Sequence, residues 1–171
     1  MLGTHGRFGS QKHRLGSVAE EIFRRSRVPV LTIGPTVHGT GVDARFRRVL
    51  FATDFEHSSH SAVHYAVSLA QENQGQLVLL HVINGPQPAG GSKVGPSVAE
   101  AMHQLYELIP ERSQSRYRSE AVVRYGEPSK QIIETAKQRC ADLIVLGVHD
   151  HATSLDIATH LERTTAYECA R

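Results

Sequence analysis

Small residues near the start of the chain have the types and the spacing that suit phosphate binding. Gly3 and Gly6 are followed, after a spacer of nine residues, by Gly16 and Ser17. Glycine has no Cβ, so the backbone at these positions can approach phosphate oxygens closely. The N–H groups of a turn and of a helix start bind anions, and the Ser17 hydroxyl is a further donor. The spacing therefore predicts a phosphate-binding loop.

Residues at the ends of expected strands form a second group of candidates. Asp54 directly follows an apolar, β-favouring run, Val82 lies in the next such run, and Gly147 ends a third. Continuous apolar runs of this length suit strands that are covered on both faces. These residues can act together only in a sheet whose strand ends lie side by side.

From residue 47 onward the pattern alternates between strands and helices. Strands that alternate with helices are parallel, and the helices pack on the sheet. In such a sheet the ligand lies outside the carboxyl ends of the strands, where the strand order reverses. The expected strands are 49–53, 77–83, 121–125 and 142–147; the expected helices begin near residues 61, 98, 128 and 155, and Gly75 is the expected stop of the first helix.

The first 35 residues repeat the end of the same pattern. They contain a glycine-rich turn, an expected helix over 14–27 and an expected strand over 28–33. A partial copy of this kind indicates a tandem repeat of which only the end is present. The expected organisation is a remnant of a first domain over 1–35, a linker over 36–46, and a second domain over 47–171 that lacks its fifth strand.

The flanks of the glycine pattern carry a resemblance to a known family. Residues 2–7, 15–20 and 28–31 resemble the phosphate and ribose loop and the closing strand of ATP-binding universal stress proteins. The resemblance implies an α/β fold of the adenine-nucleotide alpha-hydrolase-like (Rossmann-like) type, a three-layer sandwich around a parallel sheet. It also implies a non-catalytic stress-response protein that binds ATP, with Mg²⁺, or another adenine nucleotide. The loop residues that match are Gly3, Gly6, Gly16, Ser17 and Val18.

The segment 47–171 is similar to the same family. By that resemblance, Asp54 is the acid that contacts the adenine base, and Val82 packs on the base and hydrogen-bonds it through its backbone. Gly147 matches the end of the fourth strand, where the phosphate loop begins. The resemblance therefore implies that the adenine side of a nucleotide site lies in this segment.

This segment departs from the family pattern in its phosphate loop. Asp150 replaces the second glycine, and His160 and Leu161 replace the Gly-Ser pair. A carboxylate close to phosphates costs on the order of 1 kcal/mol or more. The departures favour an alternative function, a nucleotide-free dimerisation or adaptor module. A composite site, with the loop of residues 1–35 over Asp54 and Val82, also stays open.

The spare strand 28–33 has an expected partner. The second domain ends before a fifth strand, so its sheet would have an open edge, which is an aggregation hazard. We hypothesise that residues 28–33 pair at that edge, within the chain or across a homodimer. The expected macromolecular partner is therefore a second copy or a tandem domain joined through the last strand.

Composition excludes several other classes. With 19 basic and 17 acidic side chains the net charge is only +2, which gives no support for nucleic-acid binding. No apolar run is long enough for a membrane span, and no signal peptide is apparent at the start. Cys140 and Cys169 form no CxxC motif, which favours a reducing compartment. The expected location is the cytoplasm.

Other motifs are rejected as sites of chemistry. His57, His60 and His64 have the spacing of one helix face, but no carboxylate or cysteine completes a zinc set, so no metal site is expected. Gly39 and Gly41 do not follow a strand, and the Gly-Lys-Ser/Thr order of a P-loop is absent. No nucleophile and base stand out, so the protein is expected not to be an enzyme, with weak ATPase activity left open.

Overall fold

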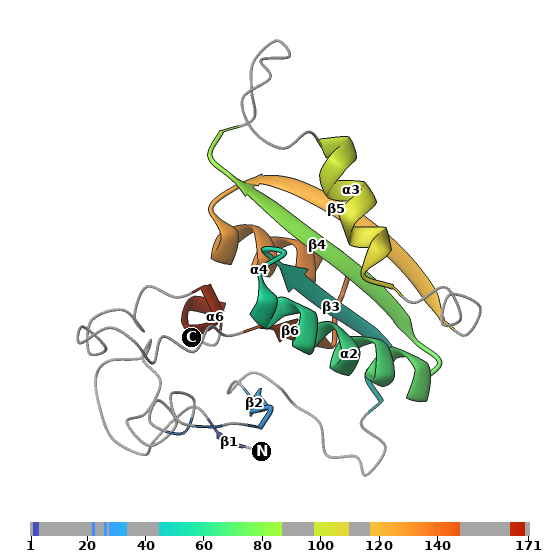
Figure 1. Cartoon of the computed structure of the whole chain (residues 1–171). Coiled ribbons are helices and arrows are strands. Elements are labelled where there is room, and N and C mark those ends of the chain that lie inside the picture. Colours follow the sequence, from blue (N-terminus) through green and yellow to red (C-terminus); the bar gives the residue numbers. More distant parts are fainter. Residues whose placement is uncertain are drawn as a thin grey trace, which may run out of the picture. The chain divides into compact units, whose positions relative to one another are not determined.

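A parallel sheet of four strands organises residues 45–150, one of two compact units into which the chain divides. Side by side, the strands are β5 (Arg118–Gly126), β4 (Gln76–Asn84), β3 (Arg48–Thr53) and β6 (Leu143–Leu146). Each neighbouring pair is parallel, and Figure 1 shows the sheet with its helices. The expected α/β fold with a parallel sheet is confirmed.

The computed structural model describes residues 2–3, 22, 26, 28–33, 45–86, 98–109, 117–147 and 165–169. The second compact unit combines residues 1–44 with 151–171. The domain boundaries that the sequence suggests, near residues 35 and 47, stay a prediction.

Most strands are close to their expected lengths, but β5 is longer. It begins at Arg118, three residues before the expected start. Arg118, Ser119 and Glu120 are polar, so the hydrophobic pattern does not reveal them as strand residues. They belong to the strand because they pair with residues 76–78 of β4, and only the assembled sheet supplies that pairing.

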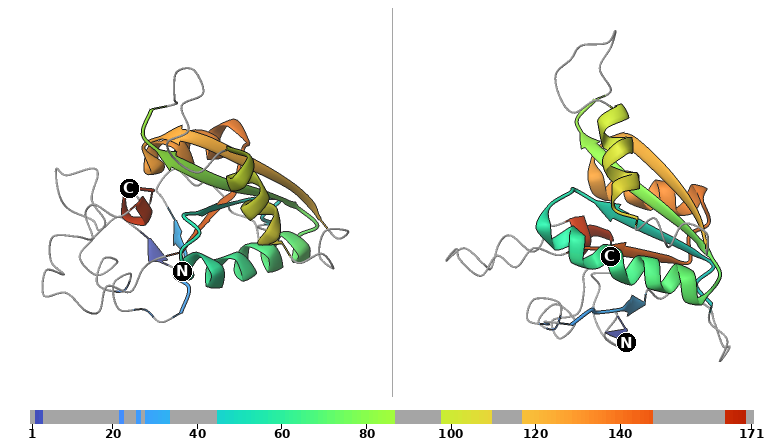
Figure 2. Two further views of the ribbon diagram at one scale, coloured as in Figure 1. Left: turned by 45° about the horizontal axis from the view of Figure 1, so that its top comes forward. Right: turned by 45° about the vertical axis from the view of Figure 1, so that its right-hand side comes forward.

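Among the described residues, three helices cover the two faces of the sheet. α2 (His57–Glu72) and α3 (Val98–Glu107) lie on one face and α4 (Pro128–Gln138) on the other (Figures 1 and 2). α2 packs on β3 and β6, α3 on β5 and β4, and α4 on β4 and β5. This is the expected three-layer arrangement. Part of each helix expected over 98–115 and 155–170 lies outside the described residues.

The core on the α2 and α3 face is built from alternate strand residues. Successive side chains of a strand point to opposite faces, so Val49 and Phe51 face one way and Leu50 the other. Burying a side chain of this size contributes about 1.5–3 kcal/mol. The buried cluster on this face comprises Val49, Phe51, Leu77 and Leu79 of the sheet, Val63, Ala66, Val67 and Ala70 of α2, Leu105 of α3, and Ile109 and Tyr117.

The opposite face of the sheet is buried as well. Leu50, Val78 and Leu80 are fully buried, and α4 contributes Ile132, which is 3% exposed. The central strands β3 and β4 are thus covered on both sides. This explains why their sequences are continuous apolar runs and do not alternate with polar residues.

The end of α2 corrects one expectation about a glycine. Gln74 has a left-handed φ of +49°; its N–H donates to the Gln71 carbonyl, and the N–H of Gly75 donates to the Ala70 carbonyl. These bonds form a Schellman motif in which Gln74 takes the position where glycine is usual. Gly75 is needed for space instead, because a Cβ there would lie 2.6 Å from the Arg47 carbonyl oxygen.

α4 begins and ends at residues with clear backbone roles. Pro128 opens the helix, where its missing N–H costs no hydrogen bond, as the sequence indicates. At the other end Cys140 has a φ of +49°. Its N–H donates to the Lys137 carbonyl, and the N–H of Ala141 donates to the Ala136 carbonyl. The same motif therefore ends both α2 and α4.

The second unit contains short elements. β1 (Leu2–Gly3) and β2 (Thr32–Ile33) form a two-stranded parallel sheet, and α6 (Thr165–Cys169) lies near the end of the chain. The strand expected over 28–33 is limited to its last two residues. It pairs with β1, and its pairing with the four-stranded sheet within one chain stays a prediction. Pairing across a dimer stays a prediction.

Substitutions at the end of α2 should have opposite effects at adjacent positions. Gln74→Gly should raise the free energy of unfolding by up to about 1 kcal/mol, because glycine adopts positive φ without a Cβ clash. Gly75→Ala should lower it by about 1–3 kcal/mol through overpacking against Arg47. Urea denaturation measures both. A Gly75→Ala variant as stable as the parent would contradict the close approach.

Burial of the Tyr117 hydroxyl should lower the stability of the protein. The side chain is 7% exposed and, within the described part of the chain, its Oη has no hydrogen-bond partner. Tyr117→Phe should therefore stabilise the protein by about 1 kcal/mol. Burial also raises the pKa of Tyr117, so the parent loses stability as the pH rises above about 10.

The matched control for Tyr117 is Tyr106→Phe, because Tyr106 is 45% exposed. Unfolding at pH 7 and in an alkaline series measures both variants. Only Tyr117→Phe should raise the free energy of unfolding at pH 7 and reduce the loss of stability at alkaline pH. A lower stability of Tyr117→Phe at pH 7 would mean that the hydroxyl makes a favourable interaction.

Candidate functional site

The carboxyl edge of the sheet brings three predicted residues together. Thr53, the last residue of β3, pairs with His81; Asp54 directly follows β3, and Val82 is the next residue of β4. Gly147 directly follows Leu146, the last paired residue of β6 on the other side of β3. The chain passes from β3 outward to β4 and β5 and then returns to β6. The strand order thus reverses at β3, which is where ligands bind in such sheets.

β4 continues beyond the end of β3. Residues 82–84 pair with residues 124–126 of β5, whereas β3 ends at Thr53. Among the described strands, none pairs with the β3 side of β4 beyond His81. Backbone N–H and C=O groups require partners, so this side of β4 at Val82 offers hydrogen bonds to a flat polar ligand.

Asp54 is held in place by the start of α2. Its Oδ1 accepts hydrogen bonds from the Glu56 N–H (3.0 Å) and from the Ser59 hydroxyl (2.8 Å). Ser59 is only 3% exposed, and the helix cap residue Glu56 makes no capping bond with its own side chain. Asp54 therefore supplies an acceptor for the helix start, and the two bonds fix the orientation of its exposed carboxylate.

Phe55 has an unusual backbone conformation in the turn that follows β3. Its φ is +68°, which is rare for a bulky residue and costs about 1–3 kcal/mol. The Phe55 N–H donates to Thr53 Oγ1 at 2.9 Å. Its ring stacks on the His81 ring with centroids 4.3 Å apart, and His81 Nδ1 donates to the Thr53 carbonyl at 2.9 Å. These contacts hold the strained turn and set the His81 tautomer.

Sequence reasoning assigned no role to Ser59, Phe55 or His81. The signals were present but weak. Ser59 comes five residues after Asp54, where a helix begins, and His81 is a polar residue within an apolar strand. The strand register shows that His81 lies next to the site, because it pairs with the residue that precedes Asp54. Ser59 bonds Asp54 directly, whereas Phe55 and His81 hold the neighbouring turn through Thr53 and through each other.

The charges at this edge differ between the strands. Asp54 and Glu56 follow β3 and Glu127 follows β5, and all three side chains are exposed. Carboxylates attract hydrogen-bond donors and repel phosphates. Gly147, after β6, carries no side chain. The geometry near β3 therefore suits the donor groups of a base, and phosphates would be better placed toward β6.

The predicted phosphate-loop residues belong to the N-terminal part of the chain. Gly3 lies in β1, where it pairs with Ile33 in the second unit. Gly6, Gly16, Ser17 and Val18 lie outside the described residues, as do Asp150, His160 and Leu161. The phosphate-loop part of the site remains a prediction.

The three histidines that the sequence spaces like one helix face belong to no metal-binding group in the part of the chain that the structure describes. His57, His60 and His64 lie on α2 and are exposed. Within the described ranges, no group of three or more His, Cys, Asp or Glu side chains could hold a metal ion. Among the same residues, no helix is both long and apolar enough to cross a membrane.

Comparisons with known proteins agree with this architecture. A family model described as the universal stress protein family matches residues 45–163. The comparison with curated proteins found no match.

Solved structures show the same fold. A universal stress protein from Archaeoglobus fulgidus DSM 4304 is similar over 98% of this chain and 55% of its own, with a TM-score of 0.71 and 24% identity. Another universal stress protein from Archaeoglobus fulgidus covers 72% and 90% (TM-score 0.52, 16% identity). The hypothetical protein MJ0577 covers 66% and 81% (TM-score 0.51, 16% identity). The chain spans about half the length of the first of these.

Loss of the Asp54 carboxylate should destabilise α2 at its start. Asp54→Ala should lower the free energy of unfolding by about 0.5–2 kcal/mol, because the Glu56 N–H and the Ser59 hydroxyl lose their acceptor. Asp54→Asn keeps an oxygen acceptor and should lose less. Urea denaturation at pH 7 compares them. Equal stability of the parent and both variants would show that the two bonds contribute nothing.

Proposed function

The chain belongs to the universal stress protein family, and we propose that it is a non-catalytic stress-response protein that binds ATP or another adenine nucleotide. The proposed site is the carboxyl edge of the four-stranded sheet. One observation carries the proposal: the strand register brings Asp54, Val82 and Gly147 together where the strand order reverses. Each of these residues is also a nucleotide position by family resemblance.

The adenine base fits the groups near β3. Its exocyclic amine is a donor that the Asp54 carboxylate can accept, and Asp54 is already oriented by Glu56 and Ser59. The ring can hydrogen-bond the backbone of Val82, on the side of β4 that β3 leaves open. Guanine has an oxygen in place of that amine, and an oxygen facing a carboxylate is unfavourable. The site should therefore select adenine.

The phosphates would lie beside a loop that carries a negative charge. Gly147 leaves room at the end of β6, but Asp150 follows in sequence and adds negative charge to the loop. Mg²⁺ bound with ATP is held largely by the phosphates and water, and it would reduce the repulsion. The N-terminal loop with Gly16 and Ser17 is the second candidate for the phosphate side.

The proposal of a non-catalytic role rests on how the edge residues are used. The His81 ring stacks on Phe55 and donates through Nδ1 to a backbone carbonyl, which gives it a structural role. Asp54 is occupied with the helix start.

Nucleotide binding can be tested by thermal unfolding with millimolar Mg-ATP, Mg-GTP or neither. At 100 times the dissociation constant, ligand adds about 2.7 kcal/mol of stability, and each kcal/mol raises Tm by about 2–4 °C for a chain of this size. We expect a shift with ATP that exceeds the shift with GTP. Asp54→Ala should weaken ATP binding at least about tenfold, or about 1.4 kcal/mol.

Control variants separate binding from stability. Asp142 is an exposed aspartate at the amino edge of the sheet, so Asp142→Ala should leave the ATP affinity unchanged. Calorimetric titration well below Tm avoids unfolding of the weaker variants. If Gly16→Asp alone abolished binding, the N-terminal loop would be the site. If ATP produced no shift, the chain would be a nucleotide-free dimerisation or adaptor module.

A further inference from the structure

β5 forms a border of the sheet that no described strand covers. It is the outermost strand beside β4 and is nine residues long. All its residues except Val122 are at least partly exposed. Such an edge carries a row of unpaired backbone groups and is a template for another strand. The nine residues of β5 give a partner strand a long run of backbone groups.

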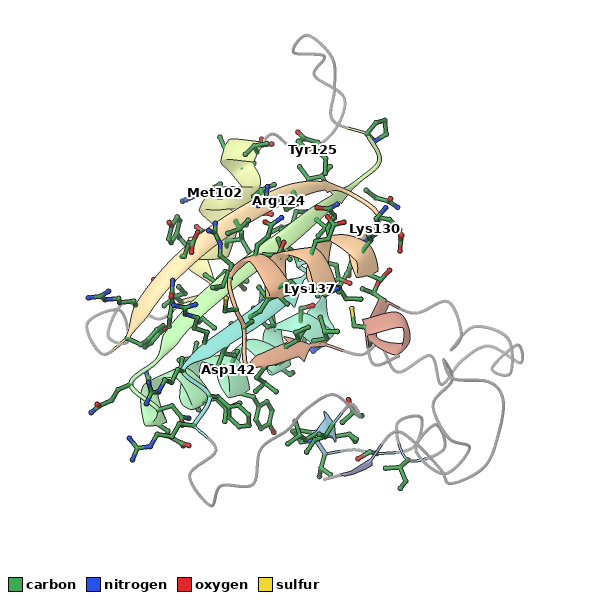
Figure 3. The ribbon with its side chains drawn as sticks, turned by 180° about the vertical axis from the view of Figure 1, so that it is seen from behind. Met102, Arg124, Tyr125, Lys130, Lys137 and Asp142 are labelled. Carbon is green, nitrogen blue, oxygen red and sulfur yellow. The ribbon has the colours of Figure 1, made fainter. Side chains whose placement is uncertain are left out.

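An apolar stripe of α3 runs beside this border. Val98, Met102 and Tyr106 are spaced four residues apart and therefore share one side of the helix. Val98 is 43% and Tyr106 is 45% exposed. α3 packs on β5, and Figure 3 labels Met102 on this helix. The border thus combines open backbone groups with an exposed apolar side.

We propose that this border is a self-association surface, on which β5 pairs antiparallel with β5 of a second copy of the chain. The charges of β5 support a second copy as the occupant. When the two-fold axis passes through Val122, Glu120 lies opposite the partner's Arg124, and Arg124 lies opposite the partner's Glu120. Opposite charges in directly facing positions stabilise a strand pair. One strand therefore carries both the acidic and the basic residue of each facing pair.

The charges also disfavour the neighbouring registers. With a two-fold axis perpendicular to the sheet, two residues that lie opposite each other must have side chains on the same face of the sheet. The residue opposite a given position can therefore change only by two positions at a time. A shift in one direction sets Arg118 opposite the partner's Arg124. A shift in the other direction sets Val122 opposite the partner's Arg124 and leaves Glu120 facing Gly126. Only the register centred on Val122 pairs every charge except Arg118, which then faces Gly126.

The two faces of the proposed interface have different characters. Ala121 and Val123 pack with the α2 and α3 core, so that face carries the apolar α3 stripe, and the two stripes would meet across the axis. On the α4 face, Arg124 donates to the Gln138 amide at 3.0 Å. Glu120 is held by Arg139 at 2.5 Å. The charged side chains are thus already oriented, and pairing would bury the apolar side chains of α3.

Sedimentation velocity over a concentration series tests the proposal on the full chain. The parent should dimerise. Arg124→Glu sets two carboxylates opposite each other twice per dimer, and we expect the dimer dissociation constant to rise at least about tenfold. Arg118→Glu is the matched control, since Arg118 faces no charge, and it should dimerise like the parent.

A mixture of two variants tests the register directly. Glu120→Lys alone and Arg124→Glu alone should each be monomeric, because each sets like charges face to face. Mixed together they restore both opposite pairs and should form a heterodimer. If Glu120→Lys did not fold by circular dichroism, Met102→Glu on the α3 stripe would take its place as a second disrupting variant, expected to be monomeric.

Three results would overturn the proposal. The parent could remain monomeric at every concentration. Arg124→Glu and Arg118→Glu could both dimerise like the parent, which would locate the interface elsewhere, as in the pairing of residues 28–33 expected from the sequence. Both could also dissociate equally, which would indicate a general charge effect. None of these results depends on nucleotide binding, so the two proposals can fail separately.

Discussion

Pairing of β3 on both of its sides is the interaction on which the rest of residues 45–150 depends. β3 lies between β4 and β6, and residues 49–53 are buried. Because both neighbours are parallel to β3, their carboxyl ends reach the same edge of the sheet. One buried strand thus fixes the core and the position of Asp54 together. A slip of one residue would exchange the side chains that pack on the two faces of the sheet and would separate Asp54 from Val82.

The two edges of the sheet have different roles. At the amino edge, the Arg48 N–H donates to Asp142 Oδ2 and the Asp142 N–H donates to the Arg48 carbonyl, both at 2.8 Å. Arg139, whose carbonyl accepts from the Arg48 side chain, pairs with Glu120. Figure 3 shows Asp142 at the end opposite Tyr125. Partly exposed ion pairs contribute little each, but these bonds join β3, β5 and the start of β6. The carboxyl edge is thereby left available for a ligand.

Ligand binding and self-association would use different parts of the same sheet. The proposed nucleotide site depends on strand ends and on the turn after β3, where Phe55 is strained. The proposed interface depends on the outer backbone of β5 and on the α3 stripe. Glu120 and Arg124 point to the α4 face, whereas His81 and Phe55 belong to the α2 and α3 side. This separation would let the two proposed functions operate without competition for the same groups.

By itself, the sequence determined the alternation of strands and helices from residue 47 to 147, and it determined the family, because apolar runs, helical spacing and glycine patterns are local. It also nominated Asp54, Val82 and Gly147. The tertiary structure alone decided the register that sets Asp54 beside Val82, the polar start of β5, and the support that His81 and Ser59 give. It also paired residues 32–33 with β1, since an apolar strand can pair with any suitable edge. These features depend on contacts between residues far apart in the chain, which no local pattern encodes.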